Sequence, residues 1–297
     1  MRALLLLILF CALGSTSCRV FEPQDQASKV LFVGNSLTYV GNVPAIYAAL
    51  SAAGGQAESA YMIVRGGATL TQRVADGSVA QALAESKYTT LVLQERGGDL
   101  VCSFGPDSCV QSRQAIKHLA DLGRQKGVKV VLLGTYQSHP SFSRRLVEKE
   151  SEAAAESGIP YIEVSDKLQC LRSTQPQLAW FAPDGMHPGK DLALLNGLLI
   201  YQELQGALPA AQSLTVKAPI YGSTSGLSEA LRAANAPPPL TDTPLEVHYP
   251  AETMAMLLSA VVRASGGYRF IKHPASRQRD LNRVLQPVTN PPVLRNS

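Results

Sequence analysis

Residues Lys29–Thr38 read KVLFVGNSLT, and the architecture of the chain can be worked out from this stretch. Four apolar residues, two of them valines, are followed at once by Gly34, Asn35 and Ser36. The pattern predicts a short buried strand that ends in a turn and places Ser36 at its C-terminal end. Ligands bind at this edge of open α/β sheets, so Ser36 is a candidate nucleophile. The alternative is that Ser36 only forms the turn or caps a helix.

Strand-like and helix-like stretches alternate through the first two thirds of the chain. Short apolar runs predict further strands at residues 60–64, 89–93, 128–133 and 160–164. Helical spacing and capping residues predict helices at residues 43–50, 110–126, 141–157 and 190–204. Strands and helices that alternate in this way imply a mostly parallel, doubly wound sheet with helices on both faces.

The alternation breaks near Pro209. Beyond it, turn-rich stretches separate two helix candidates, Gly226–Ala234 and Ala251–Ala264. No repeat and no second core pattern is visible. We therefore predict one main domain over residues 29–208, followed by a helical and loop-like appendage over residues 209–297.

The composition is that of an ordinary globular protein with a sizeable core. Of the 297 residues, 45% are hydrophobic and 17% are charged. The formal net charge is +4, and no run of Lys or Arg concentrates it, so nothing favours a nucleic-acid partner. Motifs for zinc or for a phosphate loop are missing from the sequence. We expect a protein that works without a metal or cofactor, and the oligomeric state stays open.

The N-terminus, residues 1–17, has the pattern of a signal peptide. Arg2 supplies a positive charge, and the apolar run that follows is too short to span a bilayer comfortably. Small residues then precede Cys18, which resembles the signal of a bacterial lipoprotein with Cys18 as the lipidated residue. Cleavage after Ser17 without lipidation is the alternative. With residues 18–28 as a tether, we expect an exported protein, either a periplasmic or cell-envelope lipoprotein anchored to the membrane or a secreted protein.

Export bears on the remaining cysteines. Cys102 and Cys109 bracket a loop rich in turn-forming residues, and an oxidising compartment favours a disulfide between them. Two unpaired thiols are the alternative. Cys170 is predicted to be a buried structural cysteine.

A carboxylate and a histidine lie three residues apart in the turn-rich segment Asp184–Pro188. Acyl transfer by a serine needs a base, a group that orients the base, and donors for the oxyanion. Asp184 can hold Nδ1 of His187 and leave Nε2 free to take the proton of the Ser36 hydroxyl. This pairing distinguishes His187 from the other four histidines, for which surface or structural roles are expected.

These features resemble the SGNH hydrolases, the superfamily of GDSL-like esterases. The resemblance covers residues 30–208 and rests on the strand that ends at Ser36, the glycines after the second strand, and Asp184-x-x-His187. It implies a flavodoxin-like three-layer α/β/α sandwich with a mostly parallel, five-stranded sheet. It also implies that Ser36 is the nucleophile, His187 the base, and Asp184 the residue that orients the base.

The resemblance further implies an oxyanion hole made of the Ser36 N–H, a glycine N–H and a side-chain amide. The glycine is Gly66 or Gly67, and Gly67 is preferred because it lies further past the strand. The amide is Gln94, within a Leu-Gln-Glu block that replaces the family's Gly-x-Asn-Asp and resembles a divergent branch of the superfamily. A second departure is Asn35, which stands where the family has an acidic residue before the serine.

Arg65, Arg96 and Asn35 are further candidates for contact with a substrate, and for the two arginines the alternative is a solvated charge. The resemblance implies hydrolysis of carboxylic esters through an acyl-serine intermediate. Together with export, it suggests a small-molecule or polysaccharide ester as substrate, first of all an O-acetylated carbohydrate. The alternatives are a lipid ester or thioester, and a non-catalytic binding lipoprotein that retains the fold.

Overall fold

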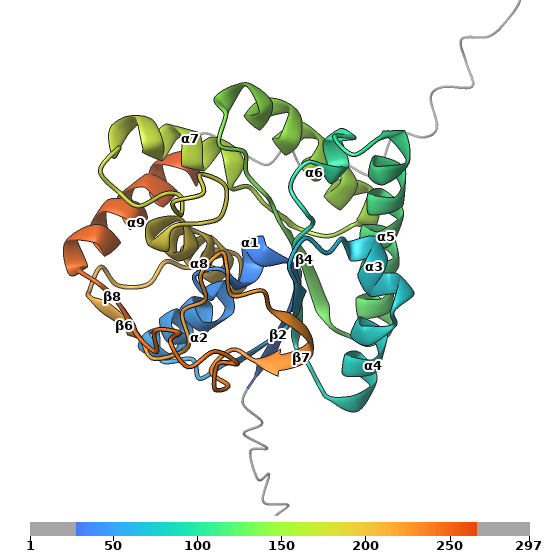
Figure 1. Ribbon diagram of the computed structural model, residues 1–297, viewed down its shortest axis with the longest axis horizontal. Coiled ribbons are helices and arrows are strands. Elements are labelled where there is room, and N and C mark those ends of the chain that lie inside the picture. Colours follow the sequence, from blue (N-terminus) through green and yellow to red (C-terminus); the bar gives the residue numbers. More distant parts are fainter. Residues whose placement is uncertain (1–27, 266–297) are drawn as a thin grey trace, which may run out of the picture.

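The computed structural model describes residues 28–265, apart from the side chains of residues 229, 230 and 263–265. The predicted signal peptide, the lipidation candidate Cys18 and residues 18–27 of the tether lie outside the described residues, as does the chain after residue 265. The described part is a three-layer sandwich in which one sheet lies between two layers of helices (Figure 1).

The sheet is built around its first strand. β1 (Lys29–Gly34) pairs in parallel with β2 (Ser59–Arg65) on one side and with β3 (Thr90–Leu93) on the other. The strands β4 (Lys129–Leu133) and β5 (Tyr161–Ile162) continue the sheet in parallel beyond β3. The resulting order, β2-β1-β3-β4-β5, is that of flavodoxin-like folds, so the predicted fold class is confirmed.

A sixth strand corrects the prediction of a five-stranded sheet. β7 (Ser228–Ala233) pairs antiparallel with β2 and forms the far edge of the sheet. It comes from the stretch Gly226–Ala234, which was predicted to be a helix. Its Ala, Leu and Arg residues favour a helix locally, but the open edge of β2 offers backbone donors and acceptors that a strand satisfies.

Alternate side chains of β1 belong to two different hydrophobic cores. Val30 and Phe32 point to one face of the sheet, whereas Leu31 and Val33 point to the other, and all are fully buried. This is the two-residue period of a strand that is covered on both faces, and it explains the unbroken apolar run in the sequence.

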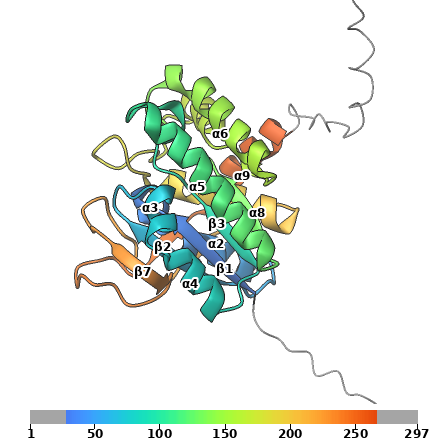
Figure 2. The same cartoon turned by 90° about the vertical axis from the view of Figure 1, so that its right-hand side faces the viewer.

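Two helical layers cover these faces (Figures 1 and 2). The layer over Val30 and Phe32 consists of α2 (Val43–Ala53), α7 (Ser165–Thr174), α8 (Lys190–Gln205) and α9 (Ala251–Ser265). The layer over Leu31 and Val33 consists of α3 (Leu70–Ala75), α4 (Ser78–Glu85), α5 (Pro106–Gln125) and α6 (Ser143–Ser157). Short elements complete the described chain: α1 (Ser36–Tyr39), η1 (Asp99–Val101), η2 (Pro140–Phe142), β6 (Leu214–Val216) and β8 (Val247–Tyr249).

Most predicted helices lie where the sequence places them. The helices at residues 141–157, 190–204 and 251–264 correspond to α6, α8 and α9 within one or two residues. By contrast, α5 begins four residues before the predicted Val110, because Pro106 takes the first helical position, where its missing N–H costs nothing.

The described residues after Pro209, up to residue 265, pack into the main core rather than forming a unit beside it. Leu214, Tyr221, Leu227 and Leu257 belong to the same buried cluster as Phe32. The small antiparallel pair of β6 and β8 precedes α9, which packs against α7 and α8.

The three cysteines of the described chain differ in whether they form a disulfide. Cys102 and Cys109 form a disulfide at the start of α5. Cys170, on α7, is a free and exposed thiol, which corrects the prediction that it is buried. Its helix turns this position outward while Leu168 and Leu171 face the core.

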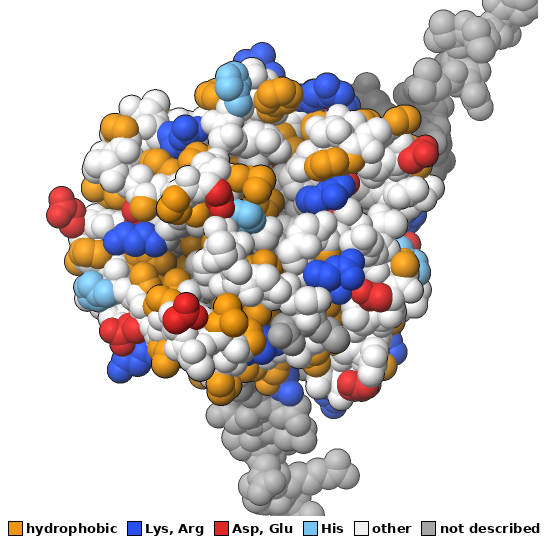
Figure 3. Space-filling view, viewed as in Figure 1, with side chains coloured by type: hydrophobic (Ala, Val, Ile, Leu, Met, Phe, Trp, Pro, Cys, Tyr) orange, Lys and Arg blue, Asp and Glu red, His pale blue; other side chains and the backbone are white. Residues whose placement is uncertain are grey.

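Positive and negative side chains are interspersed over the face shown in Figure 3 rather than gathered by sign. Within residues 28–265, no helix combines the length and the apolar character needed to cross a bilayer.

Candidate active site

The turn after β1 presents Ser36 as the first residue of α1, partly exposed at the C-terminal edge of the sheet. Asn35 caps this helix: its Oδ1 accepts from the N–H of Leu37 at 3.0 Å. A side chain at Gly34 would place its Cβ 2.2 Å from Oγ1 of Thr38, so only glycine fits here. Among the described residues, the N–H of Ser36 has no hydrogen-bond partner, as expected at the start of a helix.

The loop before α8 holds the predicted acid and base together. Oδ2 of Asp184 lies 2.8 Å from Nδ1 of His187. Oδ1 of Asp184 accepts from the N–H groups of His187 and Met186, each at 2.9 Å. These two backbone donors hold the pKa of Asp184 well below its ordinary value of 3.8, and the N–H of His187 contributes most. The carboxylate is therefore charged and fixed. Because it contacts Nδ1 of His187, the other ring nitrogen, Nε2, makes no contact with Asp184.

The nucleophile turn and the acid–base loop are neighbours. Val40 and Gly41, which follow α1, line the same cavity of about 250 Å³ as Pro183 and Pro188, which flank Asp184 and His187. In the described chain, no hydrogen bond joins the Ser36 hydroxyl to His187, whose side chain is 13% exposed. Catalytic hydrogen bonds often form only in the complex with substrate.

The two glycines after β2 have different environments. The N–H of Gly66 donates to the carbonyl of Leu227 at 3.1 Å and is therefore occupied. Gly67 has a φ of 67°, in the left-handed region that favours glycine, and its N–H has no partner among the described residues. Of the two alternatives, Gly67 is the glycine whose N–H is available to a ligand.

Gln94 directly follows β3 and is buried and hydrogen-bonded within the protein. Its side chain is 1% exposed, and both ends of the amide are engaged. Oε1 accepts from Oγ1 of Thr38 at 2.7 Å, and Nε2 donates to the carbonyl of Gly134 at 3.3 Å. Gln94 thus supports α1 through Thr38, and one of the two N–H groups of its amide is already engaged.

Asn35 and the arginines are also engaged within the protein. Asn35 is 1% exposed, and its Nδ2 donates to the carbonyl of Gln94 at 3.5 Å, so it holds the turn rather than facing a substrate. Arg96 makes a bidentate ion pair with Asp99, at 2.8 and 2.9 Å, and stacks on the exposed ring of Phe104 at 3.7 Å. Arg65 is exposed and donates to Oε1 of Gln72 at 2.9 Å.

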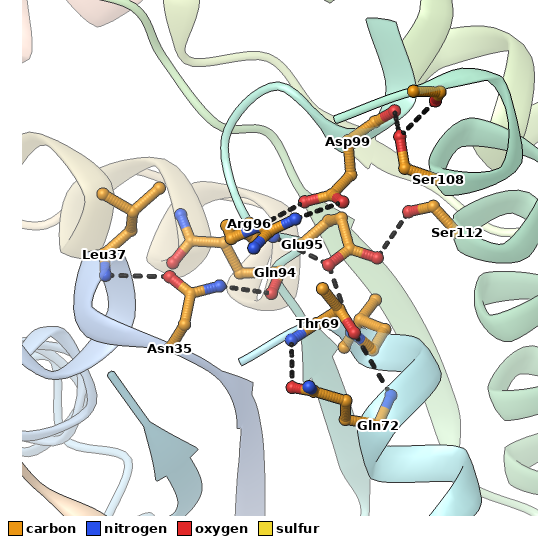
Figure 4. Close-up of polar contacts among 12 residues, drawn as sticks. Asn35, Leu37, Thr69, Gln72, Gln94, Glu95, Arg96, Asp99, Ser108 and Ser112 are labelled. Atoms are coloured by element: carbon orange, nitrogen blue, oxygen red, sulfur yellow. Dashed lines mark hydrogen bonds and ion pairs between the residues drawn. The ribbon is translucent and has the colours of Figure 1, made fainter. Parts of the chain in front are cut away.

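Glu95 organises the loops around the site, a role that the sequence did not reveal (Figure 4). Oε1 of this carboxylate accepts from the N–H groups of Leu70 at 3.1 Å and Arg96 at 2.8 Å. Oε2 accepts from the Ser112 hydroxyl. Burial, with 2% of the residue exposed, raises the pKa of Glu95. The only sequence signal was an acid two residues past the end of a buried strand.

Tyr136, at the end of β4, is a second residue that sequence reasoning missed. Its ring packs against Phe181 with 6.0 Å between centroids, and its buried hydroxyl has no partner in the described chain. Burial, followed by the nearby charge of Asp184, raises the pKa of Tyr136 well above its ordinary value. Nothing in the local sequence distinguishes this tyrosine from other core aromatics.

No three His, Cys, Asp or Glu side chains within residues 28–265 are grouped so that they could hold a metal ion. A serine and a histidine do lie in contact elsewhere in the described chain: Oγ of Ser141 lies 2.7 Å from Nδ1 of His139, without a carboxylate to orient the ring. His248 contacts Oγ1 of Thr215 at 3.0 Å, and His118 is exposed on α5. Among the histidines of residues 28–265, only His187 has the acid that a general base requires.

No protein-family model and no curated protein sequence matches this chain. Solved structures do match its fold. A candidate SGNH hydrolase from Slackia heliotrinireducens is similar with a TM-score of 0.50 and 23% sequence identity, over 60% of this chain and 99% of that one. The chain has the SGNH hydrolase fold.

A candidate GDSL-like lipase from Parabacteroides merdae is also similar, with a TM-score of 0.49 and 15% identity, over 61% of this chain and 96% of that one. The match takes in nearly all of the Slackia protein but only 60% of this chain. The SGNH fold therefore accounts for part of this chain, which carries further elements.

Proposed function

We propose that this protein is an exported serine esterase of the SGNH superfamily that hydrolyses carboxylic esters. One observation carries the proposal: Oδ2 of Asp184 lies 2.8 Å from Nδ1 of His187, in a loop next to the turn that presents Ser36. An acid that is held by two backbone N–H groups and oriented toward a histidine is the arrangement that activates a serine.

The reaction follows from these groups. Nε2 of His187 takes the proton of the Ser36 hydroxyl as Oγ attacks the ester carbonyl, and the carbonyl electrons move to oxygen. The oxyanion accepts from the N–H groups of Ser36 and Gly67, which have no other partner in the described chain. His187 then gives its proton to the leaving alcohol oxygen, and water, deprotonated by His187, releases the acid from Ser36.

The substrate class proposed is an O-acetylated carbohydrate. Support comes from the predicted signal peptide at the N-terminus, because an exported esterase meets the polysaccharides of the cell envelope and its surroundings. We further propose that Cys18 anchors the mature chain through a lipid. The second candidate substrate is a lipid ester or thioester with a longer acyl chain. The assays described next distinguish the two substrates by the preferred length of the acyl chain.

The test is the initial rate of hydrolysis of p-nitrophenyl acetate and butyrate, with fluorophosphonate labelling in parallel. The wild type is expected to hydrolyse acetate faster than butyrate and to take the label, and Ser36→Ala is expected to do neither. The matched control is Ser141→Ala, which removes a serine that contacts a histidine without a carboxylate, and which should retain both properties.

Each outcome has a consequence. Preference for acetate leads to acetylated xylan and similar glycans as the next substrates. Preference for longer chains replaces the carbohydrate proposal by a lipid ester. A wild type that is inert on both esters and takes no label rejects the esterase proposal in favour of a binding protein.

A further inference from the structure

The cavity of about 250 Å³ beside the acid–base loop adjoins both proposed catalytic residues. Val40 lines this cavity, and the N–H of Val40 donates to the carbonyl of Ser36 at 3.0 Å. Ala182 lines it as well, and the N–H of Ala182 donates to the carbonyl of His187 at 2.9 Å. An ester bound between Ser36 and His187 therefore has this cavity as its neighbour.

Segment 219–234 supplies a further wall of the cavity and is fixed at both ends. Asn42 is fully buried, and its Nδ2 donates to the carbonyl of Pro219 at 2.7 Å and to that of Ala234 at 2.9 Å. Between these two points, residues 220–224 line the cavity. The protein itself thus holds this wall in place, as is usual for a ligand site that is largely pre-formed.

Most of the cavity wall is apolar. Its buried part includes Tyr221 and Tyr249, each 1% exposed. The carbonyl of Tyr221 accepts from the N–H of Gly41 at 2.9 Å, and the hydroxyl of Tyr249 donates to the carbonyl of Lys190 at 3.2 Å. Apolar and aromatic walls with a few polar groups are typical of sites for small ligands, and here they offer a surface to the apolar face of a sugar ring.

The charge at this cavity is positive and uncompensated. Of the described residues that line it, Lys190 is the only one with a charged side chain. Lys190 is exposed, and its ammonium group makes no ion pair within residues 28–265. The acids nearby in the sequence have other partners: Asp184 contacts His187, and Oδ2 of the buried Asp191 accepts from the N–H of Ala179 at 2.7 Å.

The size of the cavity indicates which part of a substrate occupies it. The acetyl group of the proposed substrate has only a methyl group beyond its carbonyl carbon, so it needs far less than about 250 Å³. The cavity therefore has room for the alcohol part of the ester, which is the sugar. A carboxylate on that sugar would meet the ammonium group of Lys190, and the apolar wall strengthens their attraction because it excludes water.

We propose that Lys190 determines the specificity of the esterase by binding a carboxylate on the alcohol part of the ester. The preferred substrates are then acetylated acidic polysaccharides, in which uronic-acid units carry the charge. This inference rests on the proposed function and narrows its substrate class from O-acetylated carbohydrates in general to those that are anionic.

The experiment compares one polymer in two charge states. Acetate release is measured from acetylated polygalacturonate and from the same polymer after its carboxylates have been methyl-esterified. The wild type should have a kcat/KM about fivefold higher on the anionic form at low ionic strength, as expected for one accessible ion pair, and added salt should weaken this preference. A wild type that treats both forms alike, or that prefers long acyl chains, rejects the proposal.

Variants of Lys190 then assign the preference. Lys190→Gln should bring the ratio of the two kcat/KM values close to one, Lys190→Glu should reverse it, and Lys190→Arg should keep it within about twofold of the wild type. The matched control is Lys217→Gln, which removes an exposed lysine that lines a different cavity and should leave the ratio unchanged. A ratio for Lys190→Gln equal to that of the wild type overturns the role of Lys190.

A second readout does not depend on turnover. Calorimetric titration of Ser36→Ala with unacetylated oligogalacturonate measures the binding of the anion alone, and adding Lys190→Gln should raise the Kd about fivefold, whereas adding Lys217→Gln should not. If this difference is found while the wild type hydrolyses no ester, the anion site stands and the proposed esterase function alone fails. If esters are hydrolysed but neither the Kd nor the ratio depends on Lys190, the esterase stands and the anion site is rejected.

Discussion

Glu95 and Leu70 are joined by a hydrogen bond of 3.1 Å between a buried carboxylate oxygen and a backbone N–H, which fixes the end of β3 to the first turn of α3. The residues just before that turn include Gly67. A buried side chain thus couples two loops that a local reading of the sequence treats as independent.

Replacement of Glu95 tests this coupling. Glu95→Ala leaves the N–H of Leu70, the N–H of Arg96 and the Ser112 hydroxyl without their acceptor, so we expect a loss of about 3 kcal/mol or more in the free energy of unfolding. Glu95→Gln can retain these contacts and should lose far less. Urea unfolding measures the free energy of unfolding of both variants. Glu148→Ala, on the exposed side of α6, is the control. Equal losses for Glu95→Ala and Glu95→Gln would contradict the coupling.

Asp184→Asn separates the orienting role of Asp184 from its role in the turn. The amide oxygen can still accept from the N–H groups of Met186 and His187, so the loop should keep its shape. The amide nitrogen cannot accept from Nδ1–H of His187, and the wrong tautomer is then favoured. We expect kcat to fall about 10³- to 10⁴-fold. Asp121→Asn, at an exposed ion pair, is the control, and a loss below tenfold would argue against the assignment of the base.

Asn42 offers a test of how segment 219–234 is attached. Asn42→Gly keeps the left-handed backbone but removes both bonds to the segment, and should destabilise the protein by about 2 kcal/mol. Asn42→Asp places a carboxylate against two carbonyl oxygens and should cost more than Asn42→Gly. Denaturant midpoints with m-values rank the two variants. The reverse order would show that the cap of α2 by the side-chain oxygen, which aspartate retains and glycine lacks, matters more than the two bonds to the segment.

Glu150 gives the stability a dependence on pH. It is buried beneath β4 and β5, where it accepts from the N–H and hydroxyl of Thr135 and from the Tyr161 hydroxyl. Burial raises its pKa from 4.5 to about 7. The unfolded chain therefore loses this proton first, and stability due to Glu150 falls as pH rises from about 4.5 to about 7, by about 3 kcal/mol in all.

Glu150→Gln removes this titration while retaining an acceptor for Thr135. The free energy of unfolding of the wild type relative to Glu150→Gln should therefore decline between about pH 4.5 and about pH 7 and level off on either side of that window. Denaturant unfolding at several pH values measures the difference directly, and the groups common to both proteins cancel. If the free energies of unfolding of the two proteins change in parallel with pH across this window, the pKa of Glu150 is not raised.

The features that the sequence predicted correctly are those encoded locally. The run from Val30 to Val33 signals a strand that is buried on both faces, and Asp184 and His187 form their pair within a single turn. The alternation of strands and helices then leaves few possible topologies, of which the flavodoxin-like order is one.

The features that the sequence could not predict depend on distant partners. Gln94 carries the right chemical group for an oxyanion donor, but Thr38 and Gly134 occupy its amide. Segment Gly226–Ala234 has a helical composition, but the free edge of β2 makes part of it a strand. In both cases a residue 40 or more positions away along the chain decides the outcome, which no local pattern records.

The attachment of β7 to β2 has a consequence for how the chain is made. A polypeptide emerges from its N-terminus, so Ser36 and Gly67 leave the ribosome long before Ser228–Ala233 does. The bonds from Leu227 and Tyr221 to the glycine and serine turns can form only after residues 221–233 have been made. Assembly of the site therefore waits for late synthesis of the chain, and a chain that terminates before these residues lacks these bonds whatever else it has folded.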